Sequence, residues 1–124
     1  MRRIRVLVVA DSAELLERVG RAAARDAAID LVGNVCSAAA AVDLSGRWRV
    51  DVVVVDRGLP DLDGLEVTRR IKRHAAPPAV LVVALSADSQ ETAETAAAGA
   101  DALLARSEIE SRLLPLLHSL FRAP

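Results

Sequence analysis

Four side chains that can do chemistry each follow a short apolar segment of the sequence: Asp11, Asp56, Ser86 and Arg106. The two carboxylates repel each other at short distance unless a cation or a proton lies between them. Mg²⁺ is a suitable cation, because it prefers one or two carboxylates together with carbonyl oxygens and retained waters. Gly58 offers a carbonyl two residues beyond Asp56. The residues therefore predict a Mg²⁺ site made by Asp11, Asp56 and the Gly58 carbonyl.

The apolar segments have the composition of strands that are covered on both faces. Four of them are nearly continuously apolar and rich in β-branched residues: Ile4–Val9, Leu31–Val35, Val52–Val55 and Val80–Leu85. A fifth, weaker segment is Ala102–Ala105. Segments with helical spacing lie between the strands, and the last two are predicted as helices over Ser89–Ala98 and from about Ser107 to Phe121. The chain therefore consists of five β–α units.

This alternation predicts the fold. Strands that are joined by helices pair in parallel through right-handed crossovers, which places helices on both faces of one sheet. Five strands favour the flavodoxin-like order 2-1-3-4-5, an α/β three-layer sandwich with five helices. The site of such a sheet lies beyond the carboxyl ends of strands 1 and 3. Asp11 or Asp56 alone could be a helix cap, but both at this point, with Ser86 and Arg106 opposite, favour a site.

Length and composition limit the kind of protein. With 124 residues, of which 52% are hydrophobic and 27% charged, the chain is expected to form one globular domain over residues 1–124. The 17 acidic residues offset 16 basic ones, so no direct binding to nucleic acid is expected. Trp48 and Phe121 are the only large aromatic residues, which argues against an aromatic-lined cofactor site. The single cysteine, Cys36, is expected to be a small buried group.

Several other functions find little support in the sequence. No apolar stretch approaches the ~20 residues that cross a bilayer, and none has the length of a signal-peptide core. A cytoplasmic protein without a membrane partner is therefore expected. Ser86 has neither a partner histidine nor a Gly-x-Ser-x-Gly turn, so hydrolase chemistry is not indicated. Residues 11–14 are acidic where a nucleotide or flavin site would need a glycine-rich loop.

Four stretches of sequence carry a resemblance to a known family: Val6–Asp11, Asp51–Leu65, Ala84–Ala87 and Gly99–Ala102. The second is the most specific. In it an apolar strand ends in Asp56, Pro60 follows four residues later, and Asp63 and Gly64 open a helix. Through these stretches the chain resembles, over essentially its whole length, the receiver domains of two-component response regulators, which have the CheY-like fold.

The resemblance implies a function in phosphorelay signal transduction. Asp56 would be the phosphoacceptor, and it would attack a phosphohistidine of a sensor histidine kinase or a small acyl phosphate. Mg²⁺ would offset the phosphoryl charge, and Ser86 would be the hydroxyl that bonds the phosphoryl group. The domain would be no enzyme beyond its own phosphorylation. A second copy or a target protein would bind the face formed by helix 4, strand 5 and helix 5.

Three positions depart from the family pattern. Ala10 replaces the first of two consecutive acids after strand 1, which predicts weaker Mg²⁺ binding. Arg106 replaces a lysine, and a planar guanidinium differs from a compact ammonium at a phosphate. Leu103 replaces the aromatic switch residue. These departures leave an alternative open, an atypical receiver that acts as a protein-interaction or dimerisation module without phosphorylation. The resemblance also leaves open that the chain is the front part of a DNA-binding transcriptional regulator.

The final helix carries more apolar residues than one core needs. At ~100° per residue, one stripe of this helix can face the sheet: Ile109, Leu113, Leu116 and Leu120. Leu114 and Phe121 project about a third of a turn away, with Leu117 between them. We therefore predict an exposed apolar partner site at Leu114 and Phe121.

Overall fold

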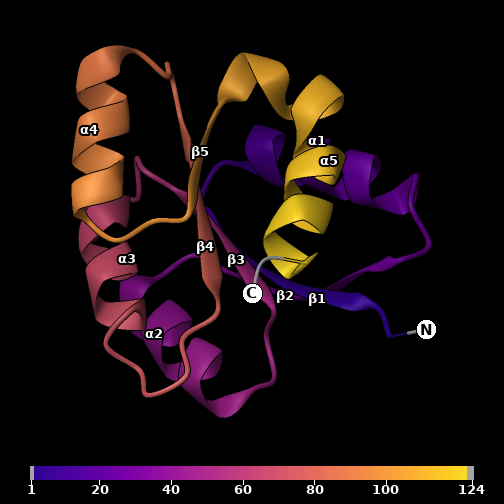
Figure 1. The fold of residues 1–124 in the computed structure, drawn as a ribbon, viewed down its shortest axis with the longest axis horizontal. Helices are drawn as coiled ribbons and strands as arrows, with labels where there is room; N and C mark the ends of the chain where they lie inside the picture. The colour runs from indigo at the N-terminus through magenta and orange to yellow at the C-terminus, as the bar shows by residue number, and fades with distance from the viewer. Residues whose placement is uncertain (1, 123–124) are drawn as a thin grey trace.

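One parallel sheet of five strands forms the centre of the molecule, in the order β2-β1-β3-β4-β5 (Figure 1). The structure is a computed structural model that describes residues 2–122. The strands are β1 Ile4–Val9, β2 Ile29–Val35, β3 Val52–Asp56, β4 Ala79–Ala84 and β5 Ala102–Ala105. The predicted strand order and the flavodoxin-like fold class are confirmed.

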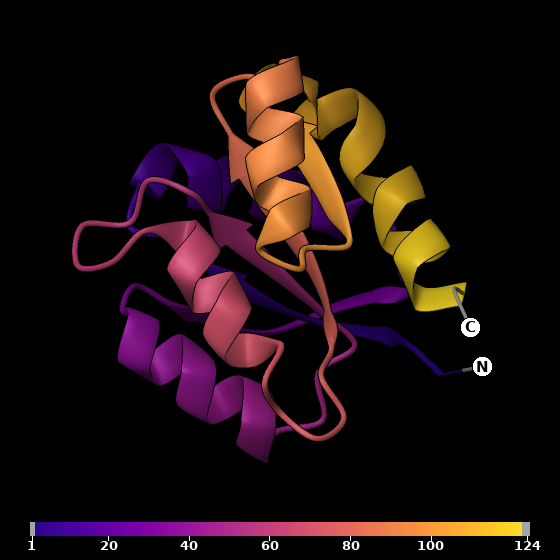
Figure 2. The same cartoon turned by 60° about the vertical axis from the view of Figure 1, so that its left-hand side comes forward.

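Helices cover both faces of this sheet (Figures 1 and 2). They are α1 Ala13–Ala24, α2 Ala38–Arg47, α3 Gly64–Ile71, α4 Ser89–Ala97 and α5 Ile109–Arg122, with a 3₁₀ turn over Arg106–Glu108 before α5. α1 and α5 lie on one face, α2 and α3 lie on the other, and α4 lies beside β5. Within residues 2–122, none of the helices is both long enough and apolar enough to cross a membrane.

The strands are apolar on both sides because each side faces a layer of helices. In β1, Val6 and Val8 belong to the core under α1 and α5, whereas Leu7 and Val9 belong to the core under α2 and α3. All four side chains are at most 3% exposed. β3 repeats this alternation. Burial on both sides explains why the strands form continuous apolar runs in the sequence.

The helices after β1, β2, β3 and β4 begin at one edge of the sheet, and each begins with a side-chain cap. Ser12, Ser37, Asp63 and Asp88 accept hydrogen bonds from backbone N–H groups of the first turns. Such caps satisfy donors that a helix start leaves unpaired. The carboxyl edge of the sheet, where these strands end, therefore gathers the polar loops.

The final helix differs from the prediction. Its buried residues are Ile109, Leu113 and Leu117, so Leu117 belongs to the buried stripe. Leu114 and Phe121 are half-buried and pack against the same core. The prediction that these two side chains are exposed is therefore wrong. The physical reason is that α5 contacts α1 as well as the sheet, so it buries a wider face than the sheet alone requires.

Two smaller predictions also fail. Cys36 is exposed, because it follows the last residue of an edge strand and lies in a loop. β4 ends at Ala84, one residue earlier than predicted. Leu85 and Ser86 therefore belong to an exposed loop, and Leu85 is 86% exposed.

The chain's single tryptophan, Trp48, follows α2 and packs against the backbone of the edge strand β2 at Gly33. The register between β1 and β2 shifts between Val6 and Leu7, which indicates a bulge. A Cβ at Gly33 in β2 would lie 2.9 Å from the Trp48 ring, so glycine makes room for the indole. Trp48 remains 42% exposed.

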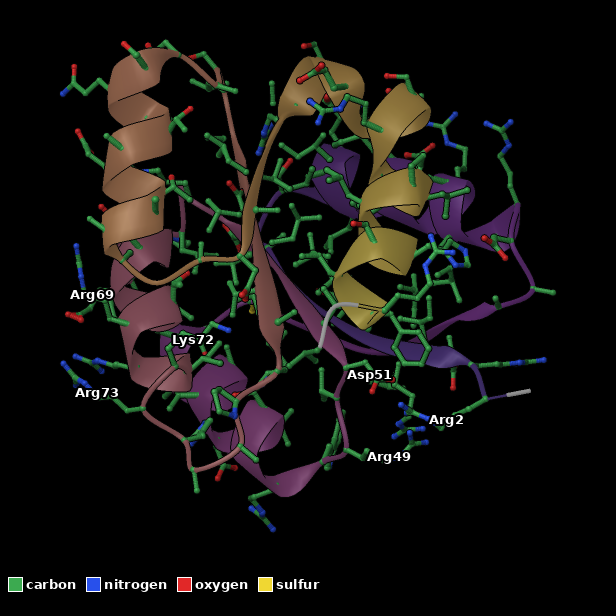
Figure 3. The ribbon with its side chains drawn as sticks, in the orientation of Figure 1. Arg2, Arg49, Asp51, Arg69, Lys72 and Arg73 are labelled. Carbon is green, nitrogen blue, oxygen red and sulfur yellow. The ribbon has the colours of Figure 1, made fainter. Side chains whose placement is uncertain are left out.

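Asp51 fastens the amino-terminal edge of the sheet (Figure 3). Its carboxylate accepts the backbone N–H of Arg5 at 2.8 Å, and it pairs with the Arg2 guanidinium at 3.0 Å. Arg2 in turn lies 4.8 Å from the centroid of the Phe121 ring. This arrangement links the start of β1 to the loop before β3 and to the end of α5.

Asp101 makes the same two kinds of interaction near the start of β4. Its carboxylate accepts the backbone N–H of Val80 at 2.8 Å and pairs with Lys72 at 2.6 Å. The Lys72 ammonium also donates to the Pro78 carbonyl at 2.9 Å. The start of β4 is thereby tied to the loop before β5 and to the end of α3.

Candidate functional site

Asp56 is the last residue of β3, which lies between β1 and β4, and it is 5% exposed. The backbone beyond it is fixed on two sides. The Arg57 N–H donates to the Val83 carbonyl at 2.9 Å, and the Gly64 N–H donates to the Arg57 carbonyl at 2.9 Å. A Cβ at Gly64 would lie 2.5 Å from the backbone oxygen of Asp56, so only glycine fits there. The start of α3 therefore holds Asp56 in place.

The carboxylate of Asp56 has two hydrogen-bond partners. The Gly58 N–H donates to Oδ1 at 3.0 Å, and Arg106 Nη2 donates to Oδ2 at 3.0 Å. A buried carboxylate needs such partners, because burying an unpaired charge is costly. A cavity of about 330 Å³ opens beside the carboxylate. Its lining residues are Asp56, Arg57, Gly58, Ala84, Leu85, Glu91 and Arg106. The structure thus brings Asp56, Gly58 and Arg106 together, as the sequence predicts.

Arg106 is held in position by Arg18 of α1, which the sequence reasoning missed. Arg18 Nη2 donates to the Arg106 carbonyl at 2.7 Å. The Arg18 guanidinium also donates to both carboxylate oxygens of Glu110, at 2.9 and 2.7 Å. These hydrogen bonds lower the pKa of Glu110 to about 2 and raise the pKa of Arg18. Arg18 therefore joins α1 to the junction between β5 and α5. Nothing in the local sequence signals this contact between distant residues.

Asp11 follows β1 at the same edge of the sheet. Val9 pairs with Val55, so the residues just after β1 and β3 lie next to each other. Asp11 is exposed, and its carboxylate makes no hydrogen bond or ion pair with the residues that the structure describes. Ala10, which stands where the family pattern has an acid, is 1% exposed.

The oxygen donors at this edge fit Mg²⁺. Among residues 2–122 there is no group of three or more His, Cys, Asp or Glu side chains that could hold a metal. The donors that remain are the carboxylates of Asp11 and Asp56 and the carbonyl of Gly58. A hard cation that takes one or two carboxylates and keeps several waters matches this set, whereas a transition metal would need more protein ligands.

Ala84, not Ser86, lies at the Asp56 cavity. Ala84 is the last residue of β4 and lines the cavity. Ser86 lines a neighbouring hollow, and its hydroxyl donates to the Asp88 carboxylate at 3.3 Å. The position of Ser86 therefore does not support its predicted role as the hydroxyl that bonds the phosphoryl group. The cause is the early end of β4, which the sequence hides because Leu85 continues the apolar run.

Arg57 is a second site residue that the sequence reasoning missed. Its guanidinium pairs with Glu91 and, at 2.8 Å, with Glu94, both in α4. The Asp63 carboxylate lies 3.7 Å from Arg57 Nε. The hydrogen bond from Arg57 is the main reason that the pKa of Glu94 is lowered. Arg57 directly follows Asp56 in the chain, and its side chain therefore connects the end of β3 to α4.

Leu103, which replaces the family's aromatic switch residue, lies in β5. It pairs with Val82 of β4 and packs against the core under α2 and α3, where it is half-buried. A leucine at this position offers no hydroxyl to a loop or a partner.

Known proteins share this sequence pattern. Residues 6–118 match the family model of the response regulator receiver domain. A protein-glutamate methylesterase/protein-glutamine glutaminase of Koribacter versatilis is 32% identical over 111 residues, which are 89% of this chain and 31% of that protein. The transcriptional regulatory protein CutR of Streptomyces coelicolor is 36% identical over 120 residues, which are 96% of this chain and 54% of that protein. The chain thus spans about a third to a half of these relatives.

Solved structures share the fold as well. The response regulator domain of Thermotoga maritima CheB has a TM-score of 0.89 and 25% identity, and the match covers 99% of both chains. The signal receiver domain of NarL from Mycobacterium tuberculosis has a TM-score of 0.82 and 25% identity, over 95% of this chain and 98% of that one. The similarity extends over every strand of the sheet, including β3 with Asp56.

Proposed function

This chain belongs to the response regulator receiver domain family of two-component phosphorelay signalling, and we propose that Asp56 is its phosphoacceptor. One observation carries the proposal. Asp56 is a buried carboxylate at the end of the central strand, it is paired with Arg106, and it faces a cavity of about 330 Å³. That space gives a phosphoryl donor access to a carboxylate that the rest of the fold shields.

In the proposed reaction, a carboxylate oxygen of Asp56 attacks the phosphorus atom of the donor. A new P–O bond forms while the P–N bond of a phosphohistidine, or the P–O bond of an acyl phosphate, breaks. The leaving imidazole or carboxylate keeps the electron pair. Arg106 already donates to Asp56 at 3.0 Å, and the other N–H groups of its planar guanidinium can donate to the phosphoryl oxygens.

Mg²⁺ would neutralise part of the phosphoryl charge when it is bound. Asp11, Asp56 and the Gly58 carbonyl are the residues of this chain that would hold it. Because Ala10 supplies no second carboxylate after β1, we expect lower Mg²⁺ affinity than an acid pair gives. Ala84 beside the cavity likewise supplies no hydroxyl, so Arg106 and backbone N–H groups do the binding of the phosphoryl oxygens.

The partners follow from the family. The donor is a phosphohistidine of a sensor histidine kinase or a small acyl phosphate. A second copy of the chain or a target protein would bind the face formed by α4, β5 and α5, without the contribution that we expected from an exposed Leu114 and Phe121. The chain spans about a third to a half of these relatives, so the methylesterase and the transcriptional regulation in their names are stated of those proteins.

The proposal is tested by intact-mass measurement after treatment with acetyl phosphate and Mg²⁺. We expect one phosphoryl adduct, and we expect Asp56→Asn or a chelator to abolish it. Asp43→Asn is the matched control, because within residues 2–122 the Asp43 carboxylate pairs only with Arg47, on the exposed side of α2. Absence of an adduct at any Mg²⁺ concentration would refute phosphoacceptance and would favour the phosphorylation-independent interaction module.

A further inference from the structure

Arg57 joins two parts of the molecule that have few other connections. Its backbone is fixed in the β3–α3 junction by the hydrogen bonds to Val83 and Gly64. Its side chain is only 25% exposed, and it reaches the carboxylates of Glu91 and Glu94 in α4. The backbone of Arg57 is therefore fixed at the end of β3, and its guanidinium forms ion pairs with α4.

α4 depends on this contact because it buries little of its own surface. Thr95 is the only buried residue within the helix. The carboxyl end of α4 is connected to the sheet, because the Ala100 N–H donates to the Thr95 carbonyl and the Asp101 N–H donates to the Val80 carbonyl. At the amino end, the caps and hydrogen bonds of Ser86, Asp88 and Thr92 stay within residues 86–92. Among the described residues, Arg57 supplies the ion pairs that tie this end of α4 to the sheet.

Arg57 and Glu91 also line the cavity beside Asp56. A phosphoryl group on Asp56 would place additional negative charge in that cavity. This charge attracts the Arg57 guanidinium and repels the Glu91 carboxylate, and the two effects weaken the same ion pair. Leu103, which stands at the family's aromatic switch position, carries no polar group that could respond to the charge.

We propose that Arg57 is a positioning residue that holds the amino end of α4 against the β3 edge and releases it when Asp56 carries a phosphoryl group. α4 then pivots about its carboxyl end, where Gly99 has a φ of 95°. The partner face made by α4, β5 and α5 changes shape as a result. This inference rests on the proposed function of Asp56, but the contact with α4 exists in the unmodified chain and can be tested there.

The test is amide hydrogen exchange of the whole chain, measured on α4 with β1 as the internal reference. In the absence of a phosphoryl donor, we expect Arg57→Gln to speed exchange in the first turns of α4 by about two- to fivefold, the range of a partly exposed ion pair. The double variant Glu91→Gln with Glu94→Gln should give the same acceleration from the other side of the contact. Arg21→Gln, which removes the exposed pair with Glu17 on α1, is the matched control and should leave α4 unchanged.

Acetyl phosphate with Mg²⁺ gives the second arm, and intact mass on the same samples reports whether Asp56 is modified. In the wild type, modification should speed exchange in α4 as Arg57→Gln does, and in Arg57→Gln it should add little. An unchanged α4 in unmodified Arg57→Gln overturns the inference, and so does an equal acceleration on modification with and without Arg57. If no adduct forms while Arg57→Gln still frees α4, the phosphoacceptor proposal fails and the contact between Arg57 and α4 stands.

Discussion

The two edges of the sheet use the same kinds of ion pair in different ways. At the amino-terminal edge, Asp51 and Asp101 each accept a hydrogen bond from a backbone N–H of a strand, and each also forms an ion pair with a basic side chain. At the carboxyl edge, Asp56 accepts a loop N–H, that of Gly58, and its cation Arg106 lies beside an open cavity. Acids that satisfy the strand backbone stabilise the fold, whereas an acid at the loop edge remains available for chemistry.

The largest expected effect contrasts the two edges through stability. We expect Asp51→Ala to lower the free energy of unfolding by about 2 kcal/mol, because the Arg5 N–H and the Arg2 guanidinium lose their acceptor. Asp56→Asn should change it by less than about 1 kcal/mol, because the amide oxygen still accepts from Gly58. Urea unfolding of both variants measures the difference. Equal losses would show that the Asp56 edge is as structural as the opposite edge.

A smaller effect is expected from restoring the missing acid at the carboxyl edge. Ala10→Asp places a carboxylate at a position that is 1% exposed, close to the residues that follow β1 and β3. Without Mg²⁺ the melting temperature should fall because the acids repel each other. With Mg²⁺ the variant should regain more stability than the wild type does, because a ligand stabilises in proportion to its affinity. The same Mg²⁺-dependent shift in both proteins would contradict our account of Ala10.

The smallest effect concerns acid pH. The pKa of Glu110 is lowered from its ordinary 4.5 to about 2 by the hydrogen bonds from Arg18. A carboxyl whose folded pKa is depressed stabilises the fold above its unfolded pKa and loses this contribution as pH falls through the folded value. Acid unfolding should therefore become shallower between pH 4.5 and about 2 in Glu110→Gln. If variant and wild type lose stability equally as the pH falls, the contact between Arg18 and Glu110 only orients Arg106.

The sequence predicts the sheet well because the physical signal is local. A strand that is buried on both faces is apolar at every position, and β1 and β3 show this pattern directly. Once the strand order is known, the ends of the strands place Asp56 and Arg106 at one edge, and the structure joins them at 3.0 Å. The pairing of these two residues needed only the topology.

The errors arise where contacts between residues far apart in the sequence determine the position of a side chain. The end of β4 was predicted one residue late because Leu85 continues the apolar run past Ala84. Phe121 was expected on the surface because no local pattern shows that α1 lies beside α5. The contact between Arg57 and Glu94 joins residues 37 positions apart, and each side chain alone has the composition of an ordinary exposed helix or loop.

The indole packed on Gly33 has a spectroscopic consequence. Trp48 is the chain's single tryptophan, and the chain has no tyrosine, so ultraviolet emission comes almost entirely from the β2–α2 side of the sheet. Fluorescence of the natural chain will follow the unfolding of that edge strand and will not report changes at Asp56. Leu85, which is 86% exposed on the rim of the cavity, is where an added indole would give the carboxyl edge a signal of its own.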